Sequence, residues 1–173
     1  TIRTENVFFS LFIFFFLFLP FVIRNLSNTL RIFFSKLYMI IPIIIIFIFY
    51  LYEFQVVHKY NIIGGHWLHN IIPLFFVENN LNKIVSFIPI LIAAISLLGF
   101  QLYSKSVYIF YPVWVLSLIP LGLIEMRYYI PLVTLFLLFK KSENSLLEWI
   151  QAFYLIIISV VFCYLFIEYG IFL

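Results

Sequence analysis

Charged and aromatic side chains interrupt a very apolar sequence at three places, and the most suggestive lies near residue 125. The stretch LGLIEMRYYIPL places Glu125 and Arg127 two residues apart, with Tyr128 following them. Residues two apart in a helix do not face each other, so Arg127 should bind another anion. A planar, always charged guanidinium suits two phosphate oxygens, as in a lipid headgroup. The alternative is an arginine that anchors a helix end among headgroups.

The second place is the stretch NIIGGHWLHN, which holds two of the three histidines. His66 and His69 are three residues apart, so a helix would bring them to one face. A neutral imidazole accepts a proton, and a protonated one stabilises a departing phosphate. Two alternatives stay open: a metal pair, for which a third ligand at sound spacing is missing, and an interfacial helix whose histidines simply face water.

The third place is the start of the chain, TIRTENVFF. Arg3 and Asn6 stand immediately before a long apolar run. On their own they are equally typical of ordinary residues at a membrane boundary.

The composition indicates whether these residues belong to a soluble or a membrane protein. Of 173 residues, 66% are hydrophobic and only 10% are charged. A soluble domain of this size needs a more polar exterior, so the chain is predicted to be an integral membrane protein. There is no Asp, no Gly-rich phosphate loop and a single cysteine, and the net charge of +3 is dispersed. These features predict no cofactor, no structural metal and no nucleic-acid partner.

Apolar runs predict the elements that position these residues. About 20 apolar residues are needed to cross a bilayer. We expect one all-α, polytopic transmembrane domain over 1–173, with about six membrane helices and a short interfacial or re-entrant helix over His69–Val77. The six predicted spans are Val7–Ile23, Leu37–Tyr52, Ile84–Gln101, Val107–Ile124, a short Tyr128–Phe139 and Leu147–Ile167.

The distribution of lysine and arginine predicts the orientation. The loop between the first two spans holds Arg24, Arg31 and Lys36 without an acid, which indicates the cytoplasmic side. Alternation then places the polar segment 53–82 and the residues singled out above on the non-cytoplasmic side. Because a membrane-length run starts so close to Thr1, we expect the chain to be the C-terminal portion of a longer protein, the alternative being a missing initiator methionine.

Taken in order, the three stretches resemble the C-terminal half of GT-C type glycosyltransferases that use polyprenyl-phosphate sugars. The nearest family is that of the dolichyl-phosphate-glucose alpha-1,2-glucosyltransferases. Its Arg-Gln-Thr-Asn stretch is similar to Arg3–Asn6, and its Gly-Asp segment with two histidines and an aromatic run is similar to Gly64–Phe76. Its Glu-x-Arg-Tyr-x-Ile-Pro stretch is matched most specifically by Glu125–Pro131.

The resemblance implies transfer of a hexose, with glucose as the first choice, from a lipid-phosphate donor to a hydroxyl of a glycan or glycolipid. His66 and His69 would be catalytic, and Arg127, Glu125, Tyr128, Arg3 and Asn6 would bind substrate. The implied location is the endoplasmic reticulum membrane in a eukaryote or the cell membrane in a bacterium. The family's Asp after Gly is Gly65 here, which leaves the sugar, acceptor and linkage open. A transporter or flippase of a lipid-linked precursor and a non-catalytic membrane subunit are the alternatives.

Overall fold

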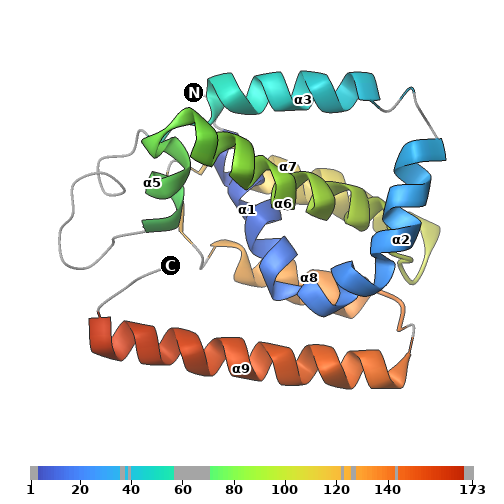
Figure 1. The fold of residues 1–173 in the computed structure, drawn as a ribbon. Helices are drawn as coiled ribbons and strands as arrows, with labels where there is room; N and C mark the ends of the chain where they lie inside the picture. Colours follow the sequence, from blue (N-terminus) through green and yellow to red (C-terminus); the bar gives the residue numbers. More distant parts are fainter. Residues whose placement is uncertain are drawn as a thin grey trace.

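A computed structural model describes residues 4–35, 38, 40–56, 71–121, 123–125, 128–142 and 144–169, and these residues are helical with short connections (Figure 1). The predicted all-α class is therefore confirmed for the described part of the chain. The elements are α1 (Glu5–Leu17), α2 (Leu19–Ser35), α3 (Ile40–Glu53), α5 (Ile71–Glu78), α6 (Asn80–Gly99), η2 (Lys105–Ile109), α7 (Phe110–Leu118), α8 (Ile130–Phe139) and α9 (Ser145–Tyr169).

Two of these helices, α6 and α9, are long and apolar enough to cross a membrane alone. A third span is possible if the bent pair α1 and α2 counts as one. Each of the six predicted spans overlaps an apolar helix, but α3, η2 with α7, and α8 are shorter than a bilayer requires. The multi-pass membrane architecture is thus supported at the level of two or three spans. The short helix predicted within 69–77 corresponds to α5, which has eight residues.

The first predicted span, Val7–Ile23, is not one straight helix. The helix stops at Leu17, and α2 continues at 94° to it. Pro20 has no N–H to donate to the carbonyl of Phe16, which weakens the helix at this point. Residues 24–35, expected as a loop, instead extend an amphipathic helix with Arg24 and Arg31 on its polar side.

Helix α1 is the centre of the bundle and packs mainly against α6, with further contacts to α2 and α7. Its aromatic side chains form the core, where edge-on ring contacts predominate, as the aromatic quadrupole favours. Phe14 is fully buried and contacts the rings of Phe100, Trp114 and Phe136 at centroid separations of 6.3, 6.0 and 4.9 Å. The outer helices α3 and α9 leave most side chains exposed, as expected for helices that face lipid.

Most charged residues lie at or near helix ends, and Figure 1 shows which of these ends lie together. At the end of the bundle that α2 crosses, η2 and α9 start and α8 ends. We call this the basic end, because α2, the start of η2 and the residues after α8 supply Arg24, Arg31, Lys105, Lys140 and Lys141. At the opposite, acidic end α1 starts and α3, α5 and α9 end, and these helix ends and the segment before α8 supply Glu5, Glu53, Glu78, Glu125 and Glu168. Among the described residues Lys83 and Glu148 depart from this division, and Glu148 pairs with the buried Lys140 across 2.7 Å.

Candidate functional site

A buried asparagine joins two of the three chemically suggestive stretches at the acidic end. Asn6, in the first turn of α1, is 1% exposed. Its Nδ2 donates to the carbonyl of Leu121 over 2.7 Å, and its Oδ1 accepts the hydroxyl of Tyr129 over 2.6 Å. The side-chain amide thus uses both its donor and its acceptor to hold the 121–129 segment against the start of α1.

Phe76, the last residue of the remaining stretch Gly64–Phe76, reaches the same place through aromatic packing. The ring of Phe9, one turn into α1, meets Tyr129 edge-on at 5.7 Å and Phe76 of α5 at 6.2 Å. Helix α5 directly follows the glycine and histidine segment in sequence. We call the meeting point of Asn6, Phe9, Phe76 and Tyr129 the three-segment junction.

A carboxylate lies beside this junction. Glu5 is 9% exposed, and among the described residues its buried Oε2 has no hydrogen-bond partner. Burying such an acceptor without a partner is unfavourable, so a site of this kind is suited to accept a hydrogen bond from a hydroxyl of a bound molecule. Glu5, Phe9, Phe12 and Phe16 follow the i, i+4, i+7, i+11 spacing of one helix face, so the face that carries the acid continues along α1 as aromatic rings.

In the segment that leads to α8, residues 121 and 123–125 are non-helical. Glu125 is half-buried and non-helical, and its backbone carbonyl accepts the N–H of Tyr128 over 3.2 Å. Residues 126 and 127 lie outside the described residues, so the spacing of Glu125 and Arg127 stays a prediction. Tyr129 precedes the first residue of α8, and burial, followed by the charges of Tyr128 and Glu125, raises its pKa. Its hydroxyl stays protonated and serves as the donor to Asn6.

Of the predicted site residues, Asn6, Glu125 and Tyr128 lie at the acidic end. Arg3, His66, His69 and Arg127 lie outside the described residues, so a meeting of the guanidinium with the two imidazoles stays a prediction. No group of three metal-binding side chains occurs in the part of the chain that the structure describes. Sequence reasoning missed Glu5 and Tyr129 as site residues. The only available signals were an acid next to Asn6 and a second tyrosine after Tyr128.

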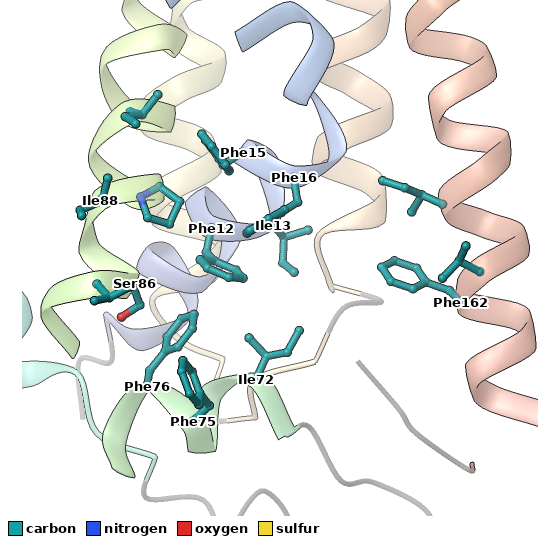
Figure 2. A pocket seen from close by; sticks show the side chains of 15 residues that line it. Phe12, Ile13, Phe15, Phe16, Ile72, Phe75, Phe76, Ser86, Ile88 and Phe162 are labelled. Carbon is teal, nitrogen blue, oxygen red and sulfur yellow. The ribbon is translucent and has the colours of Figure 1, made fainter. Parts of the chain in front are cut away.

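An apolar groove starts beside the junction and separates α1, α5 and α6 from α9 (Figure 2). Its volume is about 880 Å³. Figure 2 shows Phe75 and Phe76 of α5 at one part of the groove, with Phe12 and Phe16 of α1 beyond them and Phe162 of α9 across the gap. The one polar side chain in its lining is Ser86, whose hydroxyl is hydrogen-bonded to Tyr50 over 2.7 Å and donates to the carbonyl of Lys83 over 2.9 Å. The groove therefore suits a hydrocarbon chain.

Comparison of the chain with known protein families, with curated proteins and with solved structures finds no match.

Proposed function

We propose that this chain forms part of a membrane glycosyltransferase that transfers a hexose, with glucose as the first choice, from a polyprenyl-phosphate donor. The observation that carries the proposal is the hydrogen bond between Asn6 and Tyr129, which joins stretches 123 residues apart in sequence. Phe76 reaches the same junction through Phe9. Each of the three stretches that resemble the glycosyltransferase family thus contributes at least one residue to the three-segment junction.

The groove supports a lipid-linked donor. It begins at Phe75 and Phe76, and its lining is hydrocarbon apart from Ser86. A polyprenyl chain would lie along α1 in this groove, while its phosphate and sugar would remain at the acidic end. Burial of apolar surface would hold the chain, and the polar residues of the junction would orient the headgroup.

In the transfer step, the acceptor oxygen attacks the anomeric carbon and forms the new glycosidic bond. The bond from that carbon to the phosphate oxygen breaks, and the phosphate leaves with the electron pair. We assign Glu5 as the base that takes the proton of the acceptor hydroxyl, because its carboxylate is buried and its Oε2 is without a partner among the described residues. Arg127 would hold the phosphate, with His66 or His69 assisting and Arg3 and Tyr128 contributing to binding.

The proposal is tested by measuring transfer of labelled glucose from polyprenyl-phosphate glucose, with the intact protein in lipid nanodiscs and a panel of glycan and glycolipid acceptors. Glu5→Gln should lower kcat by about 100-fold or more and leave the unfolding temperature unchanged, because it removes a base and keeps the shape. Glu53→Gln is the matched control, since Glu53 is an exposed acid at the same end.

Full activity of Glu5→Gln would remove Glu5 from the mechanism. An Arg127→Ala variant that folds and transfers normally would contradict the proposed role of Arg127 in holding the donor phosphate. If the wild-type protein moves the lipid donor between leaflets and transfers no sugar, the flippase alternative replaces the transferase.

A further inference from the structure

A second pocket lies at the basic end, far from the three-segment junction, and the glycosyltransferase proposal does not use it. It has a volume of about 440 Å³ and lies between the first turns of α2 and the first turns of α9. One charged side chain, Arg24, contributes to its lining. The other residues that line it are Leu19, Pro20 and Ile23 from α2, and Leu147, Ile150 and Tyr154 from α9.

Arg24 differs from Arg31 and Lys140, two other basic residues at this end. Its side chain is exposed, and its guanidinium makes no hydrogen bond or ion pair with any residue that the structure describes. Arg31 donates to Asn28 of the same helix over 3.3 Å, and Lys140 is paired with Glu148. The pocket surface is apolar, so Arg24 lines it with the aliphatic part of its side chain. Its guanidinium is therefore available for an anion brought from outside the protein.

The position of α2 indicates where that anion comes from. Figure 1 shows α2 crossing one end of α6 and α9, the two helices long enough to span a membrane, and α2 turns 94° away from α1. With α6 and α9 across the membrane, α2 therefore lies along its surface. Ile23, Leu30 and Phe34 are 61%, 43% and 70% exposed, and their spacing places them on one face of the helix. Arg24 and Arg31 directly follow Ile23 and Leu30 in sequence, so they lie about 100° around the helix from this face. An apolar face flanked by basic residues is typical of a helix in the interface between acyl chains and headgroups.

We propose that this pocket binds an anionic phospholipid, with one acyl chain between α2 and α9 and the phosphate on the guanidinium of Arg24. Charge complementarity favours an anionic over a zwitterionic lipid, because Lys105 and Lys141 are also exposed at this end. The pocket supplies the apolar contact that a free phosphate would lack. Binding at this site therefore requires both the phosphate headgroup and an acyl chain of the same lipid.

The test uses the intact protein in detergent micelles with equal amounts of phosphatidylglycerol and phosphatidylcholine, and native mass spectrometry counts the retained lipids. Arg24→Gln should lower the preference for phosphatidylglycerol about fivefold, the size expected for one basic residue near an anionic surface. Arg31→Gln is the matched control and should change the preference less than twofold. Arg24→Lys keeps the charge and should retain most of it.

A second pair of variants tests the apolar part of the pocket. Ile150→Trp fills it and should reduce retention of both lipids, whereas Ile157→Trp, on the same helix and outside the pocket, should not. Equal losses for Arg24→Gln and Arg31→Gln would overturn the proposal, because they indicate general attraction to the surface. So would unchanged retention in Ile150→Trp. Displacement of the lipid by glycerol phosphate alone would identify a simple anion site. Thermal unfolding of each variant shows that a loss of binding is not a loss of fold.

Discussion

At the scale of single residues, Asn6 determines how the start of α1 meets the segment 121–129. A buried amide that loses a partner is left unsatisfied in a low-dielectric interior, so both of its hydrogen bonds must form together. The bonds to Leu121 and Tyr129 satisfy this requirement. The same contacts fix the backbone on either side of Glu125, which is how a side chain in α1 positions a segment more than 100 residues later.

Replacing Asn6 by alanine should lower the free energy of unfolding by about 3 kcal/mol, because it leaves the carbonyl of Leu121 and the hydroxyl of Tyr129 without partners. Tyr129→Phe alone should lower it by about 1–2 kcal/mol. In the Asn6→Ala background the same tyrosine change should recover part of that loss, since it removes the buried hydroxyl that has lost its partner. Reversible unfolding in mixed micelles measures all four proteins of this double-mutant cycle.

Tyr103→Phe is the control for that cycle, because Tyr103 is 81% exposed. It should leave the free energy of unfolding unchanged. Additive effects of the Asn6 and Tyr129 changes would show that the two side chains do not interact, and the junction would lose its central contact.

At the scale of elements, two hydrogen bonds attach the first turns of α9 to the break between α1 and α2. Gln151 donates to the carbonyl of Leu17 over 2.6 Å, and the hydroxyl of Tyr154 donates to the carbonyl of Phe16 over 2.7 Å. Both carbonyls lie at the break between α1 and α2, where a proline has removed a donor. Lys140 adds an ion pair to Glu148 and lies 4.1 Å from the ring centroid of Phe21. Farther along α9, Ile158, Val161 and Phe162 stand across the groove.

This attachment predicts that the width of the groove depends on two hydrogen bonds. Spin labels on Cys163 and on a cysteine introduced at Leu81, both exposed, report the distance between α9 and α6. The double change Gln151→Leu and Tyr154→Phe should broaden the distance distribution measured by pulsed electron resonance, because the backbone carbonyls at the bend lose their side-chain donors.

Trp149→Phe is a suitable control for α9, since Trp149 is 76% exposed and precedes Gln151 and Tyr154. Its distribution should match that of the wild-type protein. An unchanged distribution in the double variant would show that lipid-facing packing alone holds α9 in place.

At the scale of the whole molecule, the two ends carry opposite charge. Lysine and arginine are retained on the cytoplasmic side during insertion, so the basic end, with α2, should face the cytoplasm. The acidic end, with Glu5, Asn6 and Tyr129, should then lie on the opposite face. This orientation puts the proposed transfer site and the proposed phospholipid pocket on different sides of the membrane.

A labelling experiment tests the orientation directly. In a Cys163→Ser background, a cysteine at Asn28 should react with a membrane-impermeant maleimide only from the cytoplasmic side. A cysteine at Glu53 should react only from the other side, because α3 ends at the acidic end. Both positions are exposed. Reaction of both cysteines from one side would refute the arrangement.

The predictions from sequence succeeded where a property is local and failed where it depends on packing. The apolar helices were found because composition over some 20 residues determines which solvent a segment prefers. Their lengths were less accurate: Val107–Ile124 was expected as one span, yet α7 ends at Leu118 and Leu121 to Glu125 have no helix in the described positions. The bend at Phe18 was missed because apolar residues continue on both sides of it, and membrane helices often tolerate a proline such as Pro20 without breaking.

The sequence by itself therefore determined the solvent of this protein, its helical class and the polar stretches worth attention, since each follows from residue type and short-range spacing. Only the tertiary structure decided that Asn6 bonds to Tyr129, that Glu5 is buried beside them, and that α2 leaves the bundle at 94° to form a pocket with α9. These features depend on contacts between segments more than 100 residues apart. Hydropathy and helical periodicity contain no information about such pairs.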